Sequence, residues 1–181
     1  EILIGLVGSE MCIRDRLEGL KMGFVGDGFN MCNSLIVGCL KVGMKVSVAT
    51  PEGYEPDAKV LAFAEEMKKQ GASFELSHDI HQAADNADVL FTDAWIGMGQ
   101  EAEAEKRRAA FAGFTVDHDL LSCCKEGVMV QHCLPAHRGE EITDEVLEEH
   151  ADEIFEESEN RLHAQKAVMV MLMSEKSDFH I

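Results

Sequence analysis

The chain has 181 residues, of which 16 are Lys or Arg and 34 are Asp or Glu, so its formal net charge is −18. This length predicts one domain or one and a fraction, and the 46% apolar fraction argues against wholesale disorder. So acidic a chain is a poor partner for nucleic acid, because phosphate contacts need clustered Lys and Arg. The longest apolar run, residues 167–173, is too short to span a membrane. Six irregularly spaced Cys residues favour a reducing compartment, so we expect a soluble, cytoplasmic protein.

The first sixteen residues differ in character from the rest of the chain. The sequence begins with Glu1 rather than Met, and the apolar residues 2–7 run directly into the segment that ends in Arg14-Asp15-Arg16. A secretory signal would carry its positive charge before the apolar part. We therefore predict that residues 1–16 are a non-native leader and that one domain covers residues 17–181.

From Lys21 onward, short apolar runs alternate with segments of helical periodicity. In chain order, the pattern predicts a strand at 21–25, a helix at 30–42, a strand at 45–49, a helix at 57–70, strands at 73–76 and 87–92 around a short helix at 81–86, a helix at 101–112, a strand at 114–116, a short helix near 120, a strand at 128–131, and helices at 143–150 and 156–174. This alternation predicts an α/β fold, a Rossmann-like doubly wound parallel sheet with helices on both faces. Ligands bind such sheets beyond the carboxyl ends of the strands, which marks the segments after Val25, Thr92 and Gln131.

The first of these segments holds Gly26 and Gly28, the beginning of a dinucleotide-binding pattern. The third glycine position is Met31, however, and Thr50 follows the second strand where an acidic residue is expected. A nucleotide-binding oxidoreductase is therefore disfavoured. We predict that Asn30 caps the following helix, with its amide directed at a ligand carboxylate near the helix N-terminus.

The other two segments carry a carboxylate and a thiol. Asp93 directly follows a buried strand and is a candidate ligand for a cationic amine, with a turn or cap role as the alternative. Cys133 is either inert packing or a thiolate stabilised by a nearby Arg. A protease-like pair with His132 is disfavoured, because neighbours on an extended segment point in different directions.

Five short motifs occur in order along the chain: Gly26-Asp27-Gly28-x-Asn30 with Asn33-Ser34, Ala49-Thr50-Pro51-Glu52-Gly53-Tyr54-Glu55-Pro56, Asp93-x-Trp95-Ile96-x-Met98-Gly99-Gln100-Glu101, His132-Cys133-Leu134-Pro135 and Glu159-Asn160-Arg161. Together they resemble the ornithine-binding, C-terminal half of ornithine carbamoyltransferase, from about Leu17 to Met173. Aspartate carbamoyltransferase is disfavoured because it has a Pro at the position of Cys133.

The resemblance implies transfer of a carbamoyl group from carbamoyl phosphate to the δ-amine of L-ornithine, giving L-citrulline and phosphate. It implies no metal or cofactor, and a homotrimer. Asn30 would bind the α-carboxylate of ornithine and Asp93 its α-amino group. The other implied site residues are Gly97 and Met98 for ornithine, Cys133 as the catalytic residue that also contacts carbamoyl phosphate, and Leu134 and Arg161 for carbamoyl phosphate.

Two departures from the family keep alternatives open. Gly97 replaces a Ser that helps to bind the ornithine amino group, and Phe29 replaces an Asn. Putrescine carbamoyltransferase and a noncatalytic amino-acid-binding module are therefore alternatives. The Ser-x-Arg-Thr-Arg and His-Pro-x-Gln motifs of the family's carbamoyl-phosphate domain do not occur here, so we expect the chain alone to be inactive and to expose an apolar strip at 168–173. The acidic segment 140–159 is typical of a solvated helix face.

Overall fold

The computed structural model describes residues 17–97 and 99–173. The predicted leader, Met98 and the predicted helix end at Ser174 lie outside the described residues. The strands are β1 (Lys21–Val25), β2 (Lys45–Ala49), β3 (Phe74–Ser77), β4 (Val89–Thr92) and β5 (Met129–His132). The helices are α2 (Asn30–Lys41), α3 (Ala58–Lys69), α4 (Ile80–Ala84), α5 (Ala104–Ala110, preceded by a 3-10 turn at Glu101–Glu103), α6 (His118–Leu121), α7 (Asp144–Glu149) and α8 (Ala151–Met173).

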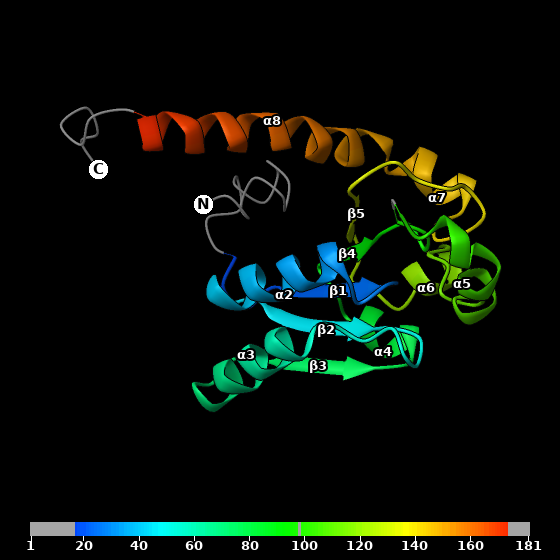
Figure 1. Cartoon of the computed structure of the whole chain (residues 1–181), viewed down its shortest axis with the longest axis horizontal. Helices are drawn as coiled ribbons and strands as arrows, with labels where there is room; N and C mark the ends of the chain where they lie inside the picture. The colour runs from blue at the N-terminus through cyan, green and yellow to red at the C-terminus, as the bar shows by residue number, and fades with distance from the viewer. Residues whose placement is uncertain (1–16, 98, 174–181) are drawn as a thin grey trace.

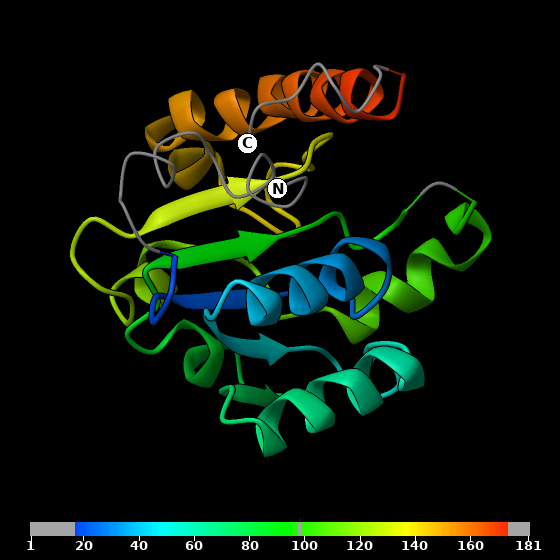
Figure 2. The ribbon, with the colours of Figure 1, turned by 90° about the vertical axis from the view of Figure 1, so that its left-hand side faces the viewer.

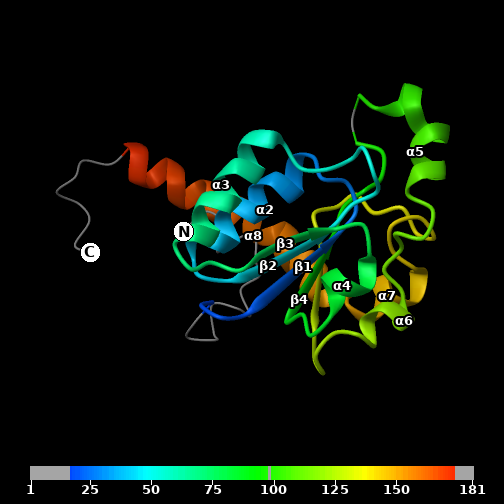
Figure 3. The same ribbon diagram turned by 90° about the horizontal axis from the view of Figure 1, so that it is seen from below.

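The strands form one parallel sheet in the order β3-β2-β1-β4-β5 (Figure 1). The chain builds outward from β1 to β3 and then returns to place β4 on the other side of β1. Figure 3 shows α2 and α3 on one side of the strands and α4 on the other. The predicted α/β fold with helices on both faces is therefore confirmed. The loops after β1, β4 and β5 leave the same edge of this sheet.

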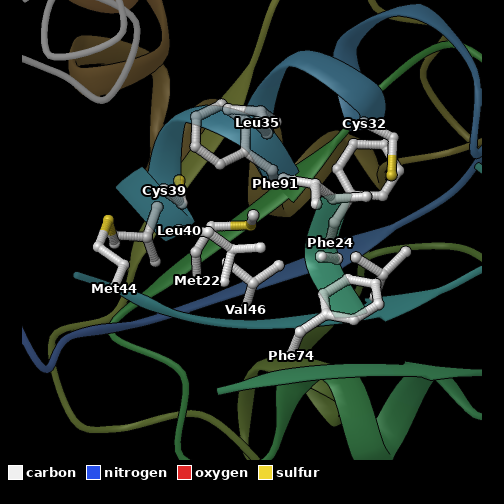
Figure 4. Close-up of a cluster of buried hydrophobic side chains, with 14 of the residues drawn as sticks. Met22, Phe24, Cys32, Leu35, Cys39, Leu40, Met44, Val46, Phe74 and Phe91 are labelled. Atoms are coloured by element: carbon white, nitrogen blue, oxygen red, sulfur yellow. The ribbon is translucent and has the colours of Figure 1, made fainter. Parts of the chain in front are cut away.

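Two apolar cores cover the two faces of the sheet. On the first face, α2 inserts Cys32, Leu35 and Cys39 between the strand side chains, and Figure 4 shows them facing Phe24 and Phe91. The second core joins the other face to the shorter helices and to the beginning of α8. Its buried members include Leu90, Val130, Leu120, Val146 and Ile154. With both faces covered, β1, β2, β4 and β5 are buried along nearly their whole length, as expected of a parallel sheet, while in the edge strand β3 only Phe74 is buried.

The structure corrects three local predictions. Phe114–Val116 is not a strand, because Val116 makes a single bridge to Ile142 while the Phe114 ring packs on Phe111. Asn30 does not cap α2; Phe29 holds the cap position without a side-chain hydrogen bond, and Asn30 is the first helical residue. The final helix begins at Ala151 instead of residue 156.

The C-terminal half of α8 exposes apolar side chains. The helix runs along one side of the molecule, and its red end lies away from the sheet (Figures 1 and 2). Met169, Val170 and Met171 are about half exposed, and Leu172 and Met173 are 81% and 84% exposed. This confirms the predicted apolar strip for residues 169–173, while Val168 is only partly exposed. Within residues 17–97 and 99–173, no helix combines the length and apolar character needed to cross a membrane.

Candidate active site

A cavity of about 420 Å³ lies at the carboxyl edge of the sheet, bordered by the three loops and by α8. The sequence placed these loops at one edge, and the cavity lining confirms that they meet there. Met98 lies outside the described residues. The remaining predicted site residues all line the cavity: Asn30, Asp93, Gly97, Cys133, Leu134 and Arg161.

Asp93 and Cys133 face each other because β4 and β5 pair in register. Thr92 is aligned with His132, so the next residue of each strand emerges side by side. The Cys133 thiol donates to Asp93 Oδ1 at 3.0 Å, and the same oxygen accepts the Ala94 amide at 2.7 Å. Burial raises the pKa of Cys133 well above its usual range, and the negative charge of Asp93 raises it further. The thiolate alternative is therefore not supported in this arrangement, and Cys133 is a neutral hydrogen-bond donor.

Hydrogen bonds to buried polar groups fix the backbone conformation of Leu134. Leu134 has a φ of 49°, a backbone region that L-residues rarely occupy. Its amide donates to His132 Nδ1 at 2.9 Å, so that nitrogen is an acceptor and His132 Nε2 carries the proton. His132 Nε2 then donates to Glu141 Oε1 at 3.1 Å, and the His137 amide donates to the same oxygen at 2.6 Å.

Glu141 is fully buried, yet these donors keep it charged. Burial alone raises the pKa of Glu141, but the hydrogen bonds from His132 and His137 outweigh it and hold the pKa below the usual range. The acidic segment 140–159 is thus not simply a solvated face. Glu141 anchors the loop that presents Cys133 and Leu134 to the cavity.

The N-terminus of α2 forms the opposite wall. Asn30 and Met31 line the cavity there, and the Asn30 side chain is exposed to it instead of capping the helix. Gly28 lets the preceding loop pass close to its neighbour, since a Cβ at this position would lie 2.4 Å from the Tyr54 carbonyl oxygen. The free N–H groups of the first helical turn favour an anionic group at this wall.

Arg107 ties the first loop to the second, a role that the sequence did not reveal. The side chain is 4% exposed, forms an ion pair with Asp27, and donates through Nε to the Trp95 carbonyl oxygen. Its guanidinium lies 4.9 Å from the Tyr54 ring centroid and 5.2 Å from that of Phe111. In sequence, Arg107 sits beside other charged residues of a helix, and no pattern marks it as buried.

Two charged residues of α8 face the third loop. Arg161 is exposed, and its Nη1 lies 3.5 Å from the Cys133 carbonyl oxygen. Glu157, one turn earlier, is fully buried, and neither carboxylate oxygen has a hydrogen-bond partner among the described residues. Burial raises the pKa of Glu157 to about 8, although the His132 backbone amide and the nearby positive charge of Arg161 both act in the opposite direction.

The cavity therefore presents a carboxylate, a thiol, a helix N-terminus and an arginine to one small space. Such a set suits a zwitterionic molecule beside a second, anionic one. Across the part of the chain that the structure describes, no group of three or more His, Cys, Asp and Glu residues is arranged to hold a metal ion.

Comparisons with known proteins agree with this interpretation of the cavity. The family model described as aspartate/ornithine carbamoyltransferase, Asp/Orn binding domain, matches residues 18–172. An ornithine carbamoyltransferase of Thermococcus kodakarensis is 52% identical over 161 residues, covering 88% of this chain and 51% of that protein. One from Gloeobacter violaceus is 52% identical over 172 residues, covering 93% and 55%.

Solved structures agree with the sequence relatives. The ornithine carbamoyltransferase of Pyrococcus furiosus superposes with a TM-score of 0.79 at 50% identity, over 87% of this chain and 50% of that one. The anabolic enzyme of Campylobacter jejuni gives a TM-score of 0.83 at 35% identity, over 90% and 55%. The chain spans about half the length of the curated relatives it matches. It belongs to the aspartate/ornithine carbamoyltransferase family, and residues 18–172 correspond to that family's Asp/Orn binding domain.

Proposed function

We propose that residues 17–181 form the ornithine-binding domain of an ornithine carbamoyltransferase, which transfers the carbamoyl group of carbamoyl phosphate to the δ-amine of L-ornithine. The products are L-citrulline and phosphate. The observation that carries this proposal is the Asp93–Cys133 hydrogen bond within a cavity that also holds Asn30 and Arg161. The names of the matched relatives support the same reaction.

In this proposal, the cavity binds the two charged ends of ornithine separately. Asp93 accepts hydrogen bonds from the α-ammonium group, replacing the thiol proton that it accepts in the free site. Asn30 and the first turn of α2 bind the α-carboxylate, as the positive end of the helix dipole favours. Gly97, on the loop that carries Asp93, also lines the cavity near the ornithine. The family resemblance adds Met98, which lies outside the described residues, as a further ornithine-binding residue. The δ-amine then points towards the third loop.

The third loop orients the reacting groups. The δ-amine must be neutral to attack, and the Cys133 sulfur and the Leu134 carbonyl oxygen orient it towards the carbamoyl carbon. Attack forms the C–N bond and a tetrahedral species. The C–O bond then breaks to expel phosphate, which takes up the proton that the amine nitrogen loses. Arg161 holds the phosphate group and stabilises the negative charge as the C–O bond breaks.

The apolar strip of α8 is the surface that we expect to pack on the carbamoyl-phosphate domain. Met169–Met173 are exposed here, and an apolar patch of this kind marks a protein interface. We also expect a homotrimer and a cytoplasmic location. The thiols of Cys32, Cys39, Cys123, Cys124 and Cys133 are free, which suits a reducing compartment.

The test is a citrulline assay on a fused enzyme, in which residues 17–181 follow the half of the Thermococcus kodakarensis protein that they do not match. We expect citrulline from the fused enzyme and none from the 181-residue chain alone. Citrulline from the chain alone would refute the need for a second domain. A folded fused enzyme that is inactive with ornithine would refute the proposed reaction.

Putrescine is the competing acceptor, because Gly97 offers no hydroxyl to an α-amino group. Asn30 and Asp93 favour an amino acid, since putrescine has no α-carboxylate for the α2 wall to bind. Comparing kcat/KM of the fused enzyme for the two amines decides between them. A higher value for putrescine would replace ornithine as the substrate.

A further inference from the structure

Glu157 is a buried acid that the proposed reaction does not use. It belongs to α8, and it and Ile154 are the two buried residues of that helix. Neither of its carboxylate oxygens has a hydrogen-bond partner among the described residues. A carboxylate that is buried without donors is strongly disfavoured in its charged form, so this environment selects the neutral acid.

The surroundings of Glu157 contain one cation, one carboxylate and one neutral thiol. Arg161 follows four residues later on α8, and Asp93 and Cys133 follow the ends of β4 and β5. The His132 backbone amide and Arg161 favour the charged form of Glu157, but burial outweighs both. Residues four apart on a helix are neighbours, so an ionised Glu157 would compete for Arg161. In the structure, the Arg161 guanidinium instead contacts the Cys133 carbonyl oxygen.

We propose that Glu157 controls the charge of the anion site: its neutral form leaves Arg161 free to bind a phosphate-type dianion, and its ionisation weakens that binding. Glu157 is thus a positioning residue that acts through Arg161 without touching the ligand. This inference rests on the proposed role of Arg161 in holding carbamoyl phosphate. Because burial raises the pKa of Glu157 to about 8, we expect the change to occur just above neutral pH.

Sulfate is the appropriate probe, because its charge stays at −2 between pH 6 and 10 while that of phosphate changes. Binding to the 181-residue chain is followed by NMR shifts of the Arg161 side chain. We expect the sulfate affinity of the wild type to fall about tenfold between pH 6.5 and 9.5, the effect of one added negative charge near the ligand. Glu157→Gln keeps the shape of the neutral acid, and we expect its sulfate affinity to change less than twofold over the same pH range.

Two further variants separate this inference from the proposed function. Asp152→Asn removes one charge from an exposed position on the same helix and keeps the wild-type pH dependence. Arg161→Gln abolishes sulfate binding at both pH values. If Arg161→Gln binds sulfate like the wild type, the anion site itself is wrongly placed. If Arg161→Gln loses binding while Glu157→Gln retains the wild-type pH dependence, the role of Glu157 is refuted and the anion site stands.

A direct titration of Glu157 in the wild type tests the proposal even if Glu157→Gln fails to fold. With carboxyl-labelled glutamate, the Glu157 carbon signal should report a protonated acid at pH 6.5 and titrate near pH 8. Titration of Glu157 in the ordinary range of glutamates, near pH 4.5, would overturn the proposal. So would wild-type sulfate binding that does not change from pH 6.5 to 9.5.

Discussion

Glu141 and Glu157 are both fully buried acids from one acidic segment, yet their environments have opposite effects. Glu141 lies beneath the third loop and accepts hydrogen bonds from His132 and His137, which lower its pKa. Glu157 lies on α8, and neither of its carboxylate oxygens has a hydrogen-bond partner among the described residues. Burial raises its pKa, and the His132 backbone amide offsets this only in part. The difference shows that hydrogen-bond donors, more than depth of burial, decide whether a buried acid stays charged. One acid fixes the loop, and the other is free to change its charge with pH.

The largest expected effect is the loss of unfolding free energy when Glu141, the acid that accepts hydrogen bonds from His132 and His137, is replaced. Glu141→Ala leaves the His132 Nε2–H and the His137 amide without their acceptor inside the protein, at a cost of about 2–5 kcal/mol in unfolding free energy. Urea denaturation at pH 7 measures it. Glu140→Ala is the matched control, because Glu140 pairs at 2.8 Å with the half-exposed Arg108, and such pairs contribute at most about 1 kcal/mol. If Glu141→Ala and Glu140→Ala lose equally small amounts of unfolding free energy, the hydrogen bonds to Glu141 do not stabilise the fold as we propose.

A smaller effect concerns the acid without donors. Between pH 4.5 and about 8, Glu157 binds a proton in the folded chain that it has lost in the unfolded chain. Its contribution therefore lowers the unfolding free energy as pH rises, by up to about 1.4 kcal/mol per pH unit. Glu157→Gln removes this decline, so its stability falls less steeply from pH 5 to 8 than that of the wild type. Parallel pH profiles for the two proteins would show that Glu157 is not held neutral.

The smallest effect concerns a polar group that is missing from the site. Gly97→Ser restores a hydroxyl at the ornithine wall, and a Cβ there meets only the end of the flexible Gln100 side chain, at 3.2 Å. One added hydrogen bond is worth about 1 kcal/mol, so we expect the KM of the fused enzyme for ornithine to fall about fivefold. Gly97→Ala supplies the carbon without the hydroxyl and should leave KM unchanged or higher. If Gly97→Ser and Gly97→Ala have the same KM for ornithine, the side chain at position 97 does not contribute to ornithine binding.

The sheet and the meeting of the three loops were predictable because both follow from chain order. Alternating strands and helices require parallel crossovers, which bring the ends after Val25, Thr92 and the fifth strand to one edge. The segment Phe114–Val116 was mispredicted because its apolar residues satisfy the strand pattern while packing on Phe111 and bridging Ile142 instead of joining the sheet.

Burial of charged residues could not be predicted, because it depends on contacts between distant segments. Arg107 forms an ion pair with Asp27, which lies eighty residues earlier in the chain. Glu157 is buried by packing of α8 on the sheet although its neighbours in sequence are acidic. At the other end of α8, the apolar Leu172 is exposed. Along this helix, residue polarity alone gives the wrong burial at both positions.

The most direct test of the central claim is the KM of the fused enzyme for L-ornithine after Asp93→Ala. The variant removes the carboxylate that we assign to the α-amino group, so we expect KM to rise tenfold or more, equivalent to about 1.4 kcal/mol of lost binding or greater. Asp85→Ala, an exposed aspartate outside the cavity lining, should leave KM unchanged. An unchanged KM in Asp93→Ala would remove Asp93 from the substrate site and contradict the account.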